Sequence, residues 1–165
     1  MYKRQDYYSI IDGKTVGPFA TGTACAALVA GASKEVSDMM YDFGTVFGRA
    51  FQLVDDLLDL TGDPEMGKPR GTDVHEGKMT LPIIHALTIL HGSEREHLAD
   101  VLNNFSDDRW NELTTLLEIS GSFSYTRQLI QNHVDRALEI ISNLPSSDAK
   151  DLISEVALIS RNRKV

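Results

Sequence analysis

The sequence is poor in cysteine and in positive charge, and each shortage excludes a class of protein. One of its 165 residues is a cysteine, Cys25, so no disulfide can form within the chain and nothing indicates an oxidising compartment. Sixteen basic residues face 24 acidic ones, which gives a formal charge of −8. This balance argues against non-specific binding to nucleic acid or to anionic membranes. We therefore expect a cytoplasmic protein with no nucleic-acid partner.

The chain also lacks an apolar run long enough to cross a membrane. The most apolar stretch, residues 16–32, is rich in Gly, Ala and Thr and contains Pro18. It falls short of the roughly 20 residues that a spanning helix needs, so we expect a buried helix and no stable membrane insertion. With 42% hydrophobic residues, the chain is long enough for one core-forming domain.

What the sequence does contain is a helical pattern of apolar residues. They recur at three and four residue spacing, as at Ile130, Val134 and Leu138, and runs with a period of two are missing. The S-x-x-E spacing of Ser93 and Glu96 predicts a capping box at the start of a helix. The pattern predicts an all-α fold, with helices over residues 7–30, 34–60, 81–91, 94–103, 108–120, 122–143 and 147–161.

One long loop interrupts these helices, between residues 61 and 80. Its glycines and prolines are Gly62, Pro64, Gly67, Pro69, Gly71 and Gly77. Such residues end helices and favour turns. Long loops in compact domains are usually functional, so we expect a site at this loop and at the helix end before it.

Three carboxylates stand at that helix end in the pattern D-D-x-x-D. On a helix Asp55 and Asp59 lie one turn apart on one face, and Asp56 is rotated by about 100 degrees. The three charges repel one another among apolar neighbours, which a bound cation would relieve. Oxygen ligands select hard ions, and Mg²⁺ typically combines one or two carboxylates with waters and phosphate oxygens.

Basic residues follow the aspartates in the loop, at Lys68, Arg70 and Lys78. Carboxylates and cations that alternate across a glycine-rich loop are what a metal-diphosphate clamp requires. The same D-D-x-x-D spacing also occurs on solvated acidic helix faces, so the motif alone leaves both interpretations open. The loop favours the metal site.

The region around the aspartates resembles a known family. FQLVDDLLDLTGD at 51–63, followed by GKPRGTDVHEGKMTLP at 67–82, is similar to the second aspartate-rich motif and following loop of the trans-prenyltransferases, the polyprenyl diphosphate synthases. The D-G-K-T of 12–15 resembles the family's Lys-Thr motif, and YDFGTVFGRAFQ at 41–52 resembles the approach to the aspartates. The resemblance covers residues 7–82 and reaches the later helices only by pattern. It implies an antiparallel helix bundle of the isoprenoid synthase type.

The resemblance implies a Mg²⁺-dependent prenyltransferase of isoprenoid biosynthesis. Its members join an allylic diphosphate to isopentenyl diphosphate, release diphosphate, and make a longer polyprenyl diphosphate; they are commonly homodimers. By resemblance, Asp55 ligates Mg²⁺, Asp56 and Asp59 support the ion and its waters, and Asp73 joins the outer shell. The residues implied to contact the allylic diphosphate and the reacting centre are Lys14, Thr15 and Gln52. Those implied to bind diphosphate are Lys14, Lys68 and Lys78.

An allylic carbocation needs a dry, apolar pocket, because water would quench it. Val16, Phe19, Thr23 and Phe47 could line such a pocket between helices. Ordinary core packing explains each of these four residues equally well.

The sequence also departs from the family pattern. A complete member carries a first aspartate-rich motif and the isopentenyl diphosphate residues well before the Lys-Thr motif, whereas only 13 positions precede Lys14. We interpret residues 1–5, MYKRQ, as a non-native leader and 6–165 as the C-terminal part of a polyprenyl synthase domain whose N-terminal helices are missing. Exposed apolar helix faces and self-association are then expected.

Two interpretations of this chain stay open. It is either a fragment of an active transferase, or a non-catalytic helical protein that binds magnesium-diphosphate or pairs with a prenyltransferase subunit. A terpene cyclase would carry an N-S-E type metal motif, which is not present. The length of the product is not readable from these residues.

Overall fold

The computed structural model describes residues 3–62 and 70–162, with the backbone alone for residues 160–162. In these ranges the chain is helical and contains no strand, which confirms the predicted fold class. No helix among the described residues is long and apolar enough to span a membrane. In chain order the elements are α1 (Arg4–Ile11), the π-helical turn η1 (Asp12–Val16), α2 (Gly17–Val29), α3 (Lys34–Thr61), α4 (Thr72–His75), α5 (Leu81–Ile89), α6 (Gly92–Asn103), the 3-10 turn η3 (Asp107–Arg109), α7 (Trp110–Ile119), α8 (Ser122–Ser142) and α9 (Asp148–Asn162).

Most of the predicted helices are present, and three local predictions are wrong. The helix predicted over 7–30 is divided by the π turn η1, and the long loop contains a short helix, α4. The capping box is also wrong, because α6 begins at Gly92 with His91 as its N-cap residue and no side-chain capping bond. Gly92 has a φ of 55°, so the chain turns there and Ser93 already lies within the first helical turn.

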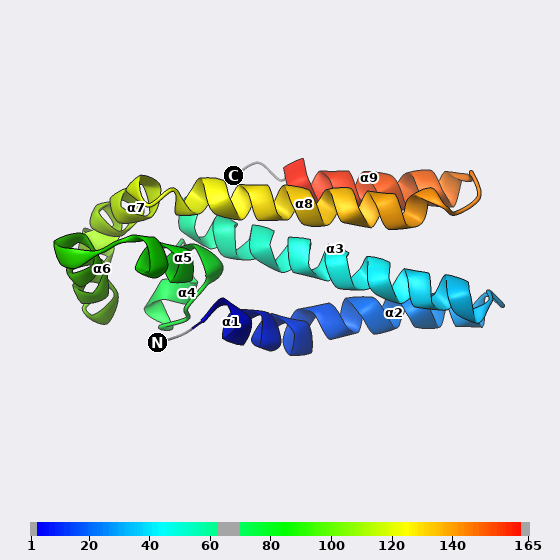
Figure 1. Ribbon diagram of the computed structural model, residues 1–165, viewed down its shortest axis with the longest axis horizontal. Helices are drawn as coiled ribbons and strands as arrows, with labels where there is room; N and C mark the ends of the chain where they lie inside the picture. Colours follow the sequence, from blue (N-terminus) through cyan, green and yellow to red (C-terminus); the bar gives the residue numbers. More distant parts are fainter. Residues whose placement is uncertain (1–2, 63–69, 163–165) are drawn as a thin grey trace. The chain divides into compact units, whose positions relative to one another are not determined.

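One compact unit comprises Tyr8–Val54 and Gln128–Lys164. In it α2 runs beside α3, and α8 runs beside α9 (Figure 1). Its core joins three helices through phenylalanine, isoleucine and alanine side chains. The rings of Phe43 and Phe47 on α3 stack with centroids 5.8 Å apart. The buried residues of this core are Phe43, Phe47, Ala137, Ile140, Ile141 and Ala157.

Helices α2 and α3 approach each other closely at two glycines of α3. A Cβ atom added to Gly44 would lie 2.6 Å from the Cα of Ala20 and 2.6 Å from the carbonyl oxygen of Phe19, and one on Gly48 would lie 3.1 Å from the Cα of Val16. Only glycine allows the two backbones to come this near. The hydroxyl of Thr23 then donates to the carbonyl oxygen of Met40 across the contact, at 2.6 Å.

The residues expected to line a carbocation pocket belong to this helix contact. Val16 and Phe47 are buried, and the ring of Phe19 meets that of Phe47 edge-on at 5.3 Å between centroids. Thr23 is occupied by the hydrogen bond to α3. These contacts favour the core-packing alternative for all four residues.

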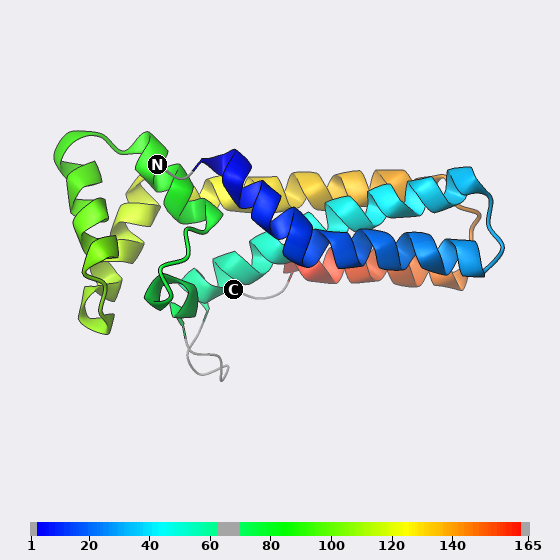
Figure 2. The same cartoon turned by 90° about the horizontal axis from the view of Figure 1, so that it is seen from below.

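Among the described residues, the second compact unit comprises 3–7, 55–62 and 70–127. Its centre is α5, which begins with Pro82 in the first turn, where a missing N–H is tolerated. Five of its nine residues are buried, namely Leu81, Pro82, Ile83, Ile84 and Ala86. Helices α6 and α7 pack against α5 and against each other (Figure 2).

Candidate active site

The three aspartates of D-D-x-x-D lie in the last two turns of α3 and differ in exposure. Asp55 is partly exposed, whereas Asp56 and Asp59 are each only 3% exposed. A buried carboxylate is costly unless it accepts hydrogen bonds. The partners of these two residues therefore decide what the motif can do.

Asp56 is held by an aromatic hydroxyl from another helix. The hydroxyl of Tyr7, on α1, donates to Oδ2 of Asp56 at 2.6 Å, and the side chain of Tyr7 is itself buried. A short bond to a carboxylate is of the charge-assisted kind, which is stronger than a bond between neutral groups. The sequence analysis missed Tyr7, because no local spacing connects it with Asp56, 49 positions away.

Asp59 is held by the backbone of the segment that follows the motif, residues 70–80, which we call the post-motif segment. Oδ1 of Asp59 accepts from the N–H of Thr72 at 3.0 Å, and Oδ2 accepts from the N–H of Asp73 at 3.1 Å. The main-chain oxygen of Asp59 accepts from the N–H of Gly71 at 2.8 Å. Both ends of the residue thus tie α3 to the start of α4.

Within the post-motif segment, one lysine bridges two carboxylates. Nζ of Lys78 lies 2.8 Å from Oδ1 of Asp73 and 2.6 Å from Oε2 of Glu76. Hydrogen bonds that Lys78 donates to Asp73, and then to Glu76, raise the pKa of Lys78, so the ammonium stays charged. The lysine side chain remains about half exposed, within reach of an incoming anion.

The segment also rests on an aromatic platform. The guanidinium of Arg70 lies 4.9 Å from the ring centroid of Trp110, a cation–π contact. Gly71 has a φ of 73°, and a Cβ there would lie 2.5 Å from Cζ3 of Trp110. His75 contributes a further link, since its Nε2 lies 2.9 Å from Oδ1 of Asp107.

The predicted magnesium ligands fit the chemistry of the ion only in part. All four are oxygen donors, as Mg²⁺ prefers. Two of them, Asp56 and Asp59, are buried and accept hydrogen bonds from the protein. No three His, Cys, Asp or Glu side chains in the described ranges come together as a metal-binding group. Asp55 and the 17% exposed side chain of Asp73 are the more accessible carboxylates.

The remaining predicted residues lie in the other unit, apart from Lys68, which is outside the described residues. Lys14 and Thr15 belong to η1, a π-helical turn of a kind frequent at functional sites. Lys14 is exposed. The hydroxyl of Thr15 donates to Oε1 of Gln52, on α3, at 2.7 Å. The structure thus joins Thr15 with Gln52 as a pair.

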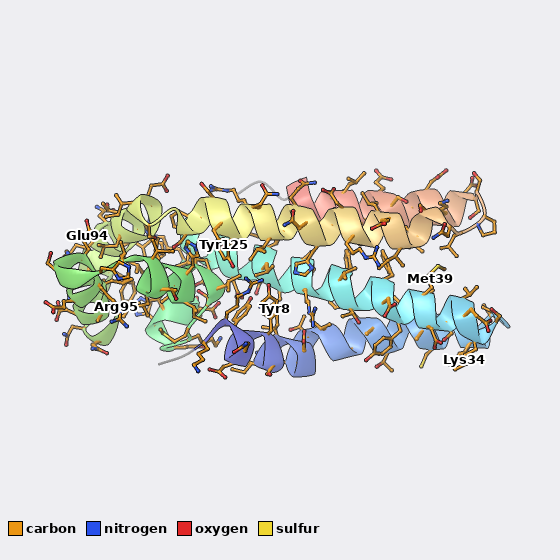
Figure 3. The ribbon with its side chains drawn as sticks, viewed as in Figure 1. Tyr8, Lys34, Met39, Glu94, Arg95 and Tyr125 are labelled. Atoms are coloured by element: carbon orange, nitrogen blue, oxygen red, sulfur yellow. The ribbon has the colours of Figure 1, made fainter. Side chains whose placement is uncertain are left out.

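A charged pair that the sequence analysis did not single out holds the same turn. Nε and one terminal nitrogen of Arg49 contact the two carboxylate oxygens of Asp12, at 2.9 and 2.6 Å. The guanidinium also lies 5.5 Å from the ring centroid of Tyr8, which is labelled in Figure 3. The hydrogen bonds with Asp12 raise the pKa of Arg49. A planar, two-pronged contact of this kind fixes geometry as well as charge.

An all-α fold that carries D-D-x-x-D at a helix end and a Lys-Thr turn defines the class of helical isoprenoid synthases, and comparison with known proteins agrees. The chain belongs to the Polyprenyl synthetase family, whose profile matches residues 2–118.

The relatives and solved structures that it resembles are longer proteins. It is 33% identical to the short chain isoprenyl diphosphate synthase of Methanothermobacter thermautotrophicus, over 93% of this chain and 47% of that relative. It is also 33% identical to the octaprenyl diphosphate synthase of Escherichia coli, over 96% and 50% of the two chains. The chain thus spans about half the length of the curated relatives it matches.

Among solved structures, the polyprenyl synthase of Caulobacter crescentus complexed with calcium and isoprenyl diphosphate is 30% identical, with a TM-score of 0.90. The match covers 99% of this chain and 51% of that one. The geranylgeranyl pyrophosphate synthetase of Pyrococcus horikoshii is 25% identical, with a TM-score of 0.91, over 99% and 50% of the two chains. These matches confirm the isoprenoid synthase type of fold.

Proposed function

We propose that this chain supplies the second aspartate motif and the Lys-Thr turn of a Mg²⁺-dependent polyprenyl diphosphate synthase. The reaction joins an allylic diphosphate to isopentenyl diphosphate and releases diphosphate. The observation that carries the proposal is the arrangement at the end of α3, where the aspartates meet a segment that presents Lys78. It occurs in a chain whose family match includes both motifs.

We assign one direct magnesium ligand and several supporting groups. Asp55 binds the ion, while Asp56, Asp59 and Asp73 support the ion and its waters. Bound Mg²⁺ would offset the negative charge that develops on the diphosphate as the allylic C–O bond breaks. Lys78 contributes a positive charge to the same group. Its pKa is raised by its carboxylate partners, so the ammonium is protonated at neutral pH, where the diphosphate is charged.

The Lys-Thr turn contributes the remaining contacts. Lys14 is exposed on η1 and is assigned to the allylic diphosphate. Thr15 and Gln52 form one hydrogen-bonded pair, in which the hydroxyl of Thr15 fixes the amide oxygen of Gln52, and both are assigned to the reacting centre. Lys68 is assigned to diphosphate from the sequence alone.

The solved relative from Caulobacter supports a divalent cation beside a diphosphate, since it is complexed with calcium and isoprenyl diphosphate. Because this chain spans about half of such relatives, we propose that catalysis requires the half of the fold that it does not span. A homodimer of the full-length form, in the cytoplasm, is part of the same proposal. The alternative is a non-catalytic chain that binds magnesium-diphosphate or pairs with a prenyltransferase subunit.

A chimera tests the proposal. The chain replaces the matching half of the Methanothermobacter synthase, and product is measured with Mg²⁺, geranyl diphosphate and labelled isopentenyl diphosphate. We expect elongated product, and a loss of at least about a hundredfold in Asp55→Ala, as is usual when a group that stabilises developing charge is removed.

A folded chimera without product contradicts the catalytic proposal. If the chain alone still binds magnesium-diphosphate in calorimetry, the non-catalytic alternative is favoured. The geranyl diphosphate assay on the chain alone, run in parallel, shows whether it needs the other half.

A further inference from the structure

The third aspartate of the motif is tied to the backbone of the segment that follows it. Asp59 is 3% exposed, and each of its carboxylate oxygens accepts a backbone N–H, from Thr72 and from Asp73. Its main-chain oxygen accepts the N–H of Gly71. Three consecutive residues of the post-motif segment are thus tied to one residue of α3. We call this set of contacts the Asp59 clasp.

The clasp is linked through Asp73 to Lys78, which is assigned to the diphosphate. Asp73, whose N–H is bound by Asp59, is also the partner of Lys78, through its carboxylate and through its main-chain oxygen, which accepts the N–H of Lys78 at 2.8 Å. The backbone from residue 71 to residue 78 therefore forms one hydrogen-bonded unit. A shift at Asp59 would move Asp73 and Lys78 together.

A second contact holds the same unit from its other side. Gly71 adopts a φ of 73° and lies so close to Trp110 that a Cβ would approach the ring to 2.5 Å. Left-handed backbone and lack of space both require glycine here. Gly71, whose N–H is bound by Asp59, thus also lies against Trp110, the single tryptophan of the chain.

We infer that Asp59 is a positioning residue, which fixes Asp73 and Lys78 against the end of α3 through the backbone of residues 71–73. The part of this inference that concerns diphosphate affinity rests on the proposed function. The part that concerns the clasp itself does not.

Four single variants of the chain separate the two roles. Asp59→Asn keeps the shape but replaces one acceptor oxygen with a donor that faces an N–H. Gly71→Ala opens the clasp from the segment side and leaves every carboxylate in place. Asp55→Asn removes the proposed ligand without touching the clasp. Gly121→Ala is the matched control, because Gly121 has a φ of 67° and its Cβ would meet nothing within 4 Å.

Three quantities are measured on each variant. Amide exchange at Thr72 and Asp73 is followed by NMR in metal-free buffer, the emission maximum of Trp110 is recorded, and the affinity for inorganic diphosphate with Mg²⁺ is determined by calorimetry. In Asp59→Asn and Gly71→Ala we expect exchange at both amides to accelerate about tenfold or more, the equivalent of one lost hydrogen bond to a charged group. We expect the emission to shift to longer wavelength and the affinity to fall in both.

Asp55→Asn should lose affinity while exchange and emission stay as in the wild type, and Gly121→Ala should change none of the three. Normal exchange at Thr72 and Asp73 in Asp59→Asn, with lost affinity, would show a ligand role and overturn the inference. Faster exchange in both clasp variants with unchanged affinity would show that the clasp is a structural contact without a role in diphosphate binding. This result would also overturn the inference. If circular dichroism shows that Asp59→Asn does not fold, the same measurements on Gly71→Ala decide between the two roles.

Failure of the proposed function would look different. In that case Asp55→Asn and the wild type would bind magnesium-diphosphate equally. The exchange and emission results in metal-free buffer would still decide whether the clasp exists.

Discussion

The Asp59 clasp and the Lys-Thr turn hold functional side chains by different physical means. In the clasp, a buried carboxylate accepts backbone N–H groups of Thr72 and Asp73. At the turn, α2 presses against α3 at Gly44 and Gly48, in the same unit as the bond between Thr15 and Gln52. The clasp depends on charge and direction. The helix contact beside the turn depends on shape, although the turn itself is also held by the charged pair of Arg49 and Asp12.

The difference indicates how each region will fail. A carboxylate clasp fails when one acceptor is lost, even if the volume of the side chain is unchanged, because buried N–H groups are left without partners. A packed helix contact tolerates polar changes at its edge but not added volume, because close-packed interiors have no space for it. Substitutions that change either the volume of a side chain or its hydrogen bond, but not both, therefore test the comparison between the two regions.

The largest effect is expected where the helix contact has no space. Gly44→Ala places a Cβ 2.6 Å from two backbone atoms of α2, so the helices must separate, at a cost of about 3 kcal/mol in the free energy of unfolding. The measurement is urea denaturation followed by circular dichroism. Gly22→Ala is the control, since its Cβ would meet nothing within 4 Å, and it should stabilise α2 by about 0.5–1 kcal/mol. Equal effects of the two variants would refute close packing at Gly44.

A smaller loss is expected at the buried tyrosine. Tyr7→Phe keeps the ring but removes the donor to Asp56, which should lower the free energy of unfolding by about 1.5–3 kcal/mol, as for other bonds to charged groups. A double-mutant cycle with Asp56→Asn measures the coupling directly. Tyr41→Phe, at an exposed ring, should stay within about 0.5 kcal/mol of the wild type. A coupling near zero would show that the bond contributes nothing.

The pair at the Lys-Thr turn is neutral and partly buried, so its effect should be smaller again. Thr15→Val removes the donor to Gln52 and keeps the volume, for an expected loss of about 1 kcal/mol. Thr15→Ser should restore most of it. Thr45→Val removes a hydroxyl bonded within its own helix on an exposed site, and should cost less than about 0.5 kcal/mol. Thermal melts of the three variants rank these losses of stability. If the Thr15→Ser variant is as unstable as Thr15→Val, the hydroxyl does not have the proposed role.

The smallest effect is expected for an exposed charge cluster, which sharpens the contrast with the buried clasp. Hydrogen bonds first from Arg109 and then from His97 lower the pKa of Glu112 from 4.5 to about 2. The stabilisation is therefore complete above about pH 4.5 and is lost as the pH falls toward 2. In the wild type the urea midpoint should decline between pH 5 and pH 3. Glu112→Gln should make this decline smaller, and Arg109→Met should also make it smaller. An unchanged decline in both variants would show that the cluster has no part in acid unfolding.

The sequence alone was sufficient for the features that depend on short-range spacing. Apolar residues three and four positions apart predicted the helices, and D-D-x-x-D with its glycine-rich follower indicated the family that the comparisons confirm. These features could be read because helix periodicity, helix breaks and motif spacing are properties of a few neighbouring residues.

The resemblance gave the three aspartates different roles, but only the tertiary structure showed how their surroundings differ. Asp55 and Asp56 are adjacent and chemically identical, yet one is partly exposed while the other is buried against Tyr7. The same holds for Asp59, whose partners at Thr72 and Asp73 lie beyond the loop. Burial and hydrogen-bond partners arise from contacts between distant segments, which local spacing does not record. The sequence therefore determined which carboxylates the motif contains. The fold decided which of them are buried and hydrogen-bonded within the protein and which one is partly exposed.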